Sequence, residues 1–282
     1  MSEYDPVDPP VALTIAGSDS GGGAGIQADL TAMTAHGVFG TAVVTATTAQ
    51  HTRGVEGVHS VPADHVASQY AAVAGDFAVA AIKTGMLATA EIVETVTDSV
   101  ADADAPLVVD PVMVAATGDR LLSPAAEDAY EDLIAAATLV TPNADEAEVL
   151  TGEPVETPAD AERAARELVA LGADAALVKG GHLAGTTDST GNNVVVDTLV
   201  RGTDPDGGVD IGRFESPRID TDATHGSGCA LSSAIAARLA RGELLHEAVE
   251  AAVAEMSEAV RRGYDVGEGP GAVNPAALDH GG

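Results

Sequence analysis

The stretch DTDATHGSGCALSSAIAA at residues 220–237 has the residue types and spacing of a phosphate-binding site. Gly226 and Gly228 directly precede an alanine-rich, periodic segment that predicts a long helix. Glycine N–H groups at a helix N-terminus converge on an anion, and the helix dipole favours negative charge there. Cys229 would lie in the first helical turn, where the pKa of a thiol falls, or it is a small buried hydrophobic residue. The segment therefore predicts an anion hole, with Cys229 either reactive or packed.

Two further stretches place oxygen atoms where a metal and a nucleotide could bind. Asp110 follows an apolar run in VVDPVM, and Asn143 and Glu146 stand three residues apart in TPNADEAE. That spacing puts both side chains on one helix face, and Mg²⁺ favours oxygen ligands with several waters retained. The same spacing fits a capping box, with the asparagine as N-cap and the glutamate three residues on. Both interpretations stay open, because a capping residue can also face a metal-bound water.

The charged residues are strongly unbalanced. The 282 residues include 44 acidic and 13 basic side chains, a formal net charge of −31, yet 45% are hydrophobic. The apolar fraction predicts a globular protein, and the acidic surface would repel phosphate backbones and anionic lipids, so we expect no nucleic-acid and no membrane partner. Acidic excess with only two lysines, Lys83 and Lys179, is typical of adaptation to high salt. We expect the retained lysines to serve as compact point charges, for example on a phosphate.

The glycine-rich stretch GSDSGGGAG at residues 17–25 is a second candidate binding loop. It lacks the third glycine of G-x-G-x-x-G, and a P-loop is excluded because no glycine precedes either lysine. The loop is either a tight strand-to-helix turn or part of a polar ligand site, and Asp19 and Asp29 favour the ligand site.

Cys229 is the only cysteine, which excludes an intrachain disulfide and a zinc site built from several cysteines. The N-terminal stretch MSEYDPVDPP has no basic segment followed by an apolar one, and no apolar run reaches roughly 18 residues. We therefore expect a cytoplasmic location.

Apolar periodicity and turn residues predict alternating strands and helices. Strands are expected at residues 11–16, 43–48, 79–82, 107–110, 139–141 and 175–178, and helices at 26–37, 62–74, 89–101, 123–137, 143–150, 158–171, 226–241 and 243–262. This order predicts an α/β architecture, a mainly parallel sheet with helices on both faces. Residues 193–200 and 209–219 alternate around GTDPDGG and predict an antiparallel hairpin at the sheet edge. We expect one domain over residues 11–274, with tails at 1–10 and 275–282.

Seven ordered motifs together resemble the hydroxymethylpyrimidine/phosphomethylpyrimidine kinases of thiamine biosynthesis, in the ribokinase-like superfamily. They are AGSDSGGGAGIQAD, VTATTAQHT, IKTGMLAT, VVDPVM, TPNADEAE, LVKGGH and THGSGCALSSAIAA, and the match runs from about residue 11 to residue 274. The resemblance implies a three-layer α/β/α sandwich and an enzyme that uses ATP and Mg²⁺ to phosphorylate the pyrimidine alcohol and then its monophosphate. It also implies a homodimer.

The resemblance assigns roles to individual residues. Asp29 and Gln50 match the positions that hold the pyrimidine, and an amide pairs well with an aminopyrimidine edge. Lys179 matches the phosphate-contacting lysine, and Cys229 stands where sugar kinases of the superfamily carry an aspartate base. The remaining assignments are the substrate site for Gly17 and Met86, the anion hole for Gly226, Ser227 and Gly228, the nucleotide site for Ser227, Thr224 and Asn143, and the metal for Asp110 and Glu146.

Two positions depart from the family pattern, and two other functions compete. A loop lysine common in the family is replaced by Ala116, for which Arg120 is a possible substitute, and His51 stands where asparagine is common. The first alternative function is a pyridoxine/pyridoxal kinase, which shares the fold; Gln50 together with Asp29 favours the pyrimidine. The second is a non-catalytic pyrimidine sensor, which would not need the retained lysines and Glu146.

Overall fold

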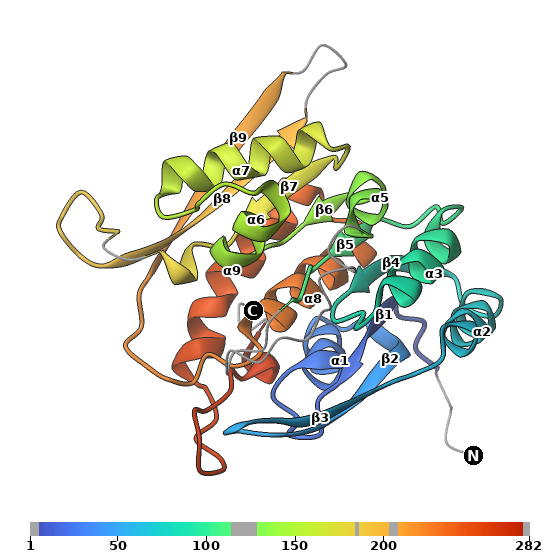
Figure 1. Cartoon of the computed structure of the whole chain (residues 1–282). Helices are drawn as coiled ribbons and strands as arrows, with labels where there is room; N and C mark the ends of the chain where they lie inside the picture. The colour runs from blue at the N-terminus through green and yellow to red at the C-terminus, as the bar shows by residue number, and fades with distance from the viewer. Residues whose placement is uncertain (1–5, 114–128, 184–185, 203–207, 279–282) are drawn as a thin grey trace.

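A nine-stranded sheet forms the centre of the computed structural model, which describes residues 6–113, 129–183, 186–202 and 208–278 (Figure 1). The strand order is β3-β2-β1-β4-β5-β6-β7-β8-β9, and the six strands from β2 to β7 in this order run parallel. Strands β3, β8 and β9 pair antiparallel with their neighbours. The strands are β1 Val11–Ser18, β2 Phe39–His51, β3 Gly54–Ser60, β4 Val79–Thr84, β5 Leu107–Val109, β6 Leu139–Val140, β7 Ala175–Val178, β8 Val194–Gly202 and β9 Val209–Pro217.

Helices cover both faces of this sheet because its strands send alternate apolar side chains to opposite sides. On β4, for example, Ile82 belongs to one buried cluster and Ala81 to the other. The first cluster packs against α2 Ala63–Ala74, α3 Ala90–Val100, α5 Tyr130–Ala135, α6 Ala144–Thr151 and α7 Pro158–Ala170. The second packs against α1 Gly25–Ala35, α8 Ser227–Ala240 and α9 Leu245–Arg261. The predicted three-layer α/β/α sandwich is therefore confirmed (Figure 1).

Most predicted elements are present, with differences that have physical reasons. β3 was not predicted, because a strand that buries neither face leaves no hydrophobic alternation in the sequence. The predicted helix at 123–137 corresponds in part to α5, and residues 114–128 lie outside the described residues. The C-terminal tail predicted from residue 275 begins with a short 3-10 helix, Pro275–Ala277, and Ala277 and Leu278 are buried. Residues 275–278 therefore belong to the packed domain.

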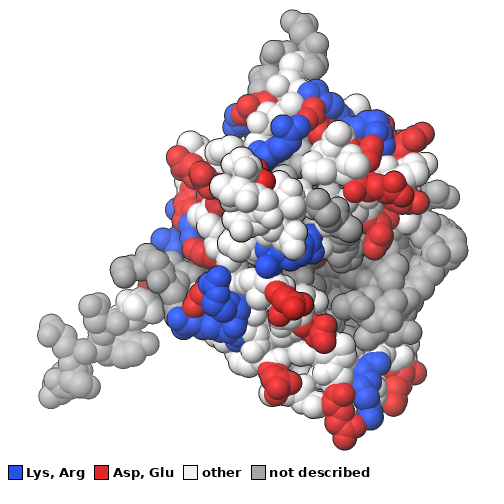
Figure 2. Space-filling view, turned by 90° about the vertical axis from the view of Figure 1, so that its left-hand side faces the viewer, with Lys and Arg blue, Asp and Glu red and all other residues white. Residues whose placement is uncertain are grey.

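The surface carries many carboxylates, and arginines pair with several of them. Figure 2 shows acidic and basic side chains interspersed on one face. Glu162, for example, lies 2.9 Å from Nη2 of Arg166 and 2.6 Å from Nη2 of Arg213. Among the described residues, no helix has both the length and the apolar composition needed to cross a membrane.

Candidate active site

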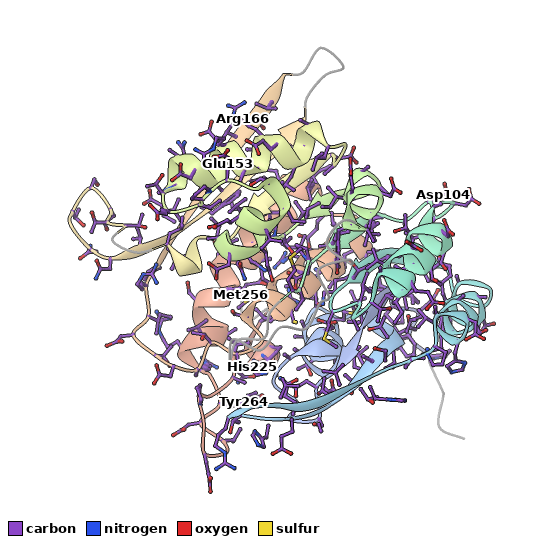
Figure 3. All side chains as sticks on the ribbon, in the orientation of Figure 1. Asp104, Glu153, Arg166, His225, Met256 and Tyr264 are labelled. Atoms are coloured by element: carbon purple, nitrogen blue, oxygen red, sulfur yellow. The ribbon has the colours of Figure 1, made fainter. Side chains whose placement is uncertain are left out.

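A cavity of about 800 Å³ lies at the carboxyl ends of the parallel strands, where α6 and α8 begin. Such sheets commonly bind ligands at this edge. The lining contains every residue that the sequence assigned to the site except Asp29: Gly17, Gln50, Met86, Asp110, Asn143, Glu146, Lys179, Thr224, Gly226, Ser227, Gly228 and Cys229. Val253, Met256 and Val260 of α9 add an apolar wall, and Figure 3 labels Met256.

The start of α8 requires glycine at two positions. Gly226 adopts a left-handed conformation with φ of 80°, and a Cβ there would lie 1.9 Å from the carbonyl oxygen of Gly23. A Cβ on Gly228 would lie 2.9 Å from Nζ of Lys179. The two glycines therefore let the helix N-terminus approach both the glycine loop and the Lys179 ammonium, which leaves two positive groups side by side.

Lys179 lines the cavity, as do the cations Lys83 and Arg218, and two carboxylates face Lys179. Its Nζ lies 3.0 Å from Oδ1 of Asp110 and 3.8 Å from Oε2 of Glu146. Burial lowers the pKa of Lys179, but the charges of Asp110 and Glu146 outweigh it, so the pKa is raised and the ammonium persists at neutral pH. Burial is the main reason why the pKa of Glu146 is raised to about 7. The charge of Lys179 lowers this pKa, and the charge of Asp110 raises it further.

Asn143 and Glu146 form the capping box that the sequence left open as one interpretation. Oδ1 of Asn143 accepts from the Glu146 N–H at 2.8 Å, and Oε2 of Glu146 accepts from the Asn143 N–H at 2.8 Å. Because both residues also line the cavity, the cap holds the Glu146 carboxylate at the site.

The prediction that the pKa of Cys229 falls is wrong. Cys229 does lie in the first turn of α8, but burial raises the pKa of its thiol to about 12. Lys83 opposes this effect, whereas Asp29 and Asp110 add to it. The thiol is therefore protonated at neutral pH.

Asp29 is the assigned site residue that does not line the cavity. It is fully buried and absent from the cavity lining. Both carboxylate oxygens lie 2.9 Å from Nζ of Lys83, and they also accept from Thr14 at 2.6 Å and Ser233 at 2.8 Å. Asp29 therefore neutralises the buried Lys83 ammonium. Burial lowers the pKa of Lys83, but the charge and hydrogen bond of Asp29 together with the charges of Cys229 and Asp110 outweigh it, so the pKa is raised.

Gly17, Met86 and Gln50 also line the cavity. A Cβ on Gly17 would lie 2.4 Å from Cε of Met86, so glycine makes room for the methionine. The Gln50 backbone N–H donates to Oγ of Ser20 in the glycine loop at 2.8 Å, and the Ser20 hydroxyl donates to the Gln50 carbonyl at 2.8 Å. The glycine loop thus positions Gln50.

His225 lines the cavity and was not singled out from the sequence. Only its place beside Gly226 pointed to it. His51, by contrast, is an exposed residue outside the lining and lies 3.4 Å from Glu56. Ala116 and Arg120 fall outside the described residues.

The fold and this site define a ribokinase-like kinase of small molecules. The chain belongs to the phosphomethylpyrimidine kinase family, whose model matches residues 19–274. A Streptomyces coelicolor protein named hydroxymethylpyrimidine/phosphomethylpyrimidine kinase is 47% identical over 277 residues, covering 98% of this chain and 96% of that protein.

Two solved structures show how similar the fold is. A Bacillus subtilis pyridoxal kinase in complex with ADP has a TM-score of 0.84 and 33% identity, covering 96% of this chain and 99% of that one. A Clostridium difficile phosphomethylpyrimidine kinase has a TM-score of 0.72 and 38% identity, covering 86% and 96%.

Proposed function

We propose that this enzyme transfers the γ-phosphoryl group of ATP to the hydroxyl of 4-amino-5-hydroxymethyl-2-methylpyrimidine, and then a second phosphoryl group to the resulting monophosphate, in thiamine biosynthesis. The observation that carries the proposal is that one cavity combines the Lys179 ammonium, the glycine start of α8 and the Gln50 amide. The family and the name of the Streptomyces coelicolor relative support this substrate.

Lys179 and α8 would do the work of phosphoryl transfer. The transition state spreads negative charge over the transferring oxygens, so catalysis is mostly positioning and charge stabilisation. The Lys179 ammonium and the N–H groups after Gly226 would supply fixed positive charge where that charge develops. Thr224 and Ser227, at the same helix start, line the cavity where the nucleotide phosphates would lie.

Asp110 and Glu146 fit a magnesium ion that keeps most of its waters. The described residues contain no group of three or more His, Cys, Asp or Glu side chains suited to a metal, but Mg²⁺ commonly uses one or two carboxylates with substrate phosphates. Asp110 and Glu146 would hold it, with Asn143 fixing Glu146 through the capping box. Bound Mg²⁺ would neutralise charge on the phosphates.

Cys229 would act as a protonated neighbour of the acceptor hydroxyl and not as a thiolate, because its pKa is about 12. A loose phosphoryl-transfer transition state makes little demand for early deprotonation of the alcohol. A small, uncharged side chain is compatible with that chemistry.

A pyridoxal kinase is the second candidate, because the Bacillus subtilis pyridoxal kinase has the higher TM-score of the two structures compared. Parallel measurements of kcat/KM with hydroxymethylpyrimidine, its monophosphate and pyridoxal, coupled to ADP formation, separate the functions. We expect the pyrimidines to be preferred. Preference for pyridoxal would favour the second candidate, and no turnover with any of them would favour a pyrimidine sensor.

We further propose that the enzyme is a homodimer that works in the cytoplasm, where ATP is available. Light scattering coupled to size-exclusion chromatography measures the molar mass of the eluting protein and so tests the dimer. The mass of a monomer would contradict it.

A further inference from the structure

His225 joins three segments of the cavity wall. It directly precedes Gly226 at the start of α8, and Figure 3 places it near the β2–β3 ribbon. Its ring packs on the glycine loop so closely that a Cβ on Gly23 would lie 2.6 Å from Cδ2. The Val273 N–H donates to the His225 carbonyl at 3.0 Å, which fixes the backbone. His225 is therefore held in place from several sides.

Asp19 defines where the ring carries its proton. Oδ2 of Asp19 lies 3.1 Å from Nε2 of His225, and the carboxylate also accepts backbone N–H groups of Gly21, Gly23 and Ala24 at 2.8, 3.1 and 2.9 Å. Burial raises the pKa of Asp19, but the bonds from His225 and the backbone outweigh it, so the pKa is lowered. A charged carboxylate only accepts hydrogen bonds, so Nε2 of His225 is a donor.

That donor constrains the amide of Gln50. Nε2 of His225 lies 3.4 Å from the amide nitrogen of Gln50. The single hydrogen on Nε2 is directed to Asp19, so the NH₂ group of Gln50 finds no acceptor at Nε2. Turning the amide about its last bond replaces the NH₂ group by the oxygen, which can share that hydrogen with Asp19 in a three-centre bond. With the oxygen toward the ring, the NH₂ group of Gln50 is available to the cavity that this residue lines.

We propose that His225 is a positioning residue for substrate recognition: tied to Asp19, it fixes the Gln50 amide with its NH₂ group toward the cavity. The site would then select a heteroaromatic substrate with a ring nitrogen that accepts a hydrogen bond there. This inference rests on the proposed function in one respect, that Gln50 contacts the substrate.

Calorimetric Kd values for hydroxymethylpyrimidine test it, because they require no turnover. His225→Phe keeps a flat ring without a donor, and we expect a Kd about 10-fold higher, the cost of one misplaced hydrogen bond. His225→Asn should raise the Kd to a similar extent, because its shorter amide reaches only the position of Nδ1 and not that of Nε2. It replaces His225→Phe in the test if the phenylalanine variant folds poorly. His225→Gln, whose amide nitrogen reaches the place of Nε2, should restore the Kd to within about 3-fold.

Two controls separate positioning from a merely structural role. The exposed His51 provides a matched variant, His51→Gln, which should leave the Kd unchanged. In a Gln50→Ala background, His225→Phe should cause no further rise in Kd, because His225 acts through Gln50. Unchanged binding by His225→Phe and His225→Asn, or an equal rise in both backgrounds, would overturn the inference while the proposed function stands. Failure of the unmodified enzyme to bind the pyrimidine would overturn both.

Discussion

Nζ of Lys179 lies 3.0 Å from Oδ1 of Asp110, and the bare Cα of Gly228 is what allows this pair to sit against the first turn of α8. The Lys179 ammonium thereby neutralises Asp110 and also lines the cavity in which we propose that the phosphates bind. Substitutions that distinguish the role of Lys179 in neutralising Asp110 from its role in the cavity are the most informative.

Lys179→Met should reduce kcat/KM by about 10²-fold or more, the magnitude typical of removing one group that stabilises transition-state charge. The matched control is Arg166→Met on α7, which removes a surface cation paired with Glu162 and should leave kcat/KM unchanged. Steady-state kinetics with circular dichroism to confirm folding provide the measurement. Near-normal turnover by a folded Lys179→Met would remove this residue from the mechanism.

Glu146 should make stability depend on pH. Its pKa is raised to about 7 in the folded protein, from an unfolded value near 4.5. The folded state therefore binds the proton more tightly, and this contribution is complete below about pH 4.5 and is lost as pH rises through about 7. Glu146→Gln should remove it, at most about 3 kcal/mol of pH-dependent unfolding free energy. Urea titrations of both proteins between pH 5 and 8 test this; parallel pH profiles would contradict the raised pKa.

The thiol of Cys229 should react slowly with iodoacetamide at neutral pH. Because the thiolate is the nucleophile and the pKa is about 12, the alkylation rate should keep rising beyond pH 9 without a plateau. Cys229 is the only cysteine, so the mass of the intact protein reports it directly. A plateau at or below the ordinary thiol pKa would show that the helix dipole outweighs burial.

Removing one partner of the buried Lys83–Asp29 pair should lower the free energy of unfolding more than removing both charges. Lys83→Met alone leaves the Asp29 carboxylate buried without its cation and should cost about 3–5 kcal/mol. The double variant Lys83→Met/Asp29→Asn removes both charges and should recover much of that loss. Chemical denaturation compares them. A double variant that recovers none of the loss would contradict the claim that an unpaired Asp29 carboxylate destabilises the single variant.

Salt should stabilise the fold, since the formal net charge is −31. Below about 0.1 M salt the Debye length exceeds about 10 Å and repulsion between carboxylates is poorly screened. We expect Tm to rise with KCl concentration. A Tm that stays flat from low to molar KCl would contradict adaptation to high salt.

Sequence patterns predicted the features that depend on residues close together in the chain. The spacing of Asn143 and Glu146 predicted a shared helix face, and the capping box that realises it depends only on neighbouring residues. The glycines at residues 226 and 228 predicted a helix start bare of side chains, and both positions are at the start of α8.

Contacts between distant segments were not predictable in this way. The Asp29–Lys83 pair was not predicted, because nothing in the segment of Asp29 reveals that Lys83, on a strand of the sheet, reaches it. The pKa of Cys229 was misjudged for the same reason: the burial of the thiol and the charges of Asp29 and Asp110, which raise this pKa, come from other elements. Likewise, the contacts of His225 with Asp19 and Gln50 could not be predicted, because they join the start of α8, the glycine loop and β2.

The measurement that tests the central claim most directly is mass spectrometry of the products formed from 4-amino-5-hydroxymethyl-2-methylpyrimidine with ATP and Mg²⁺. The account predicts the monophosphate first and the diphosphate later, with Lys179→Met forming neither at an appreciable rate. Recovery of the unmodified pyrimidine from an enzyme that binds ATP and is fully folded would contradict it.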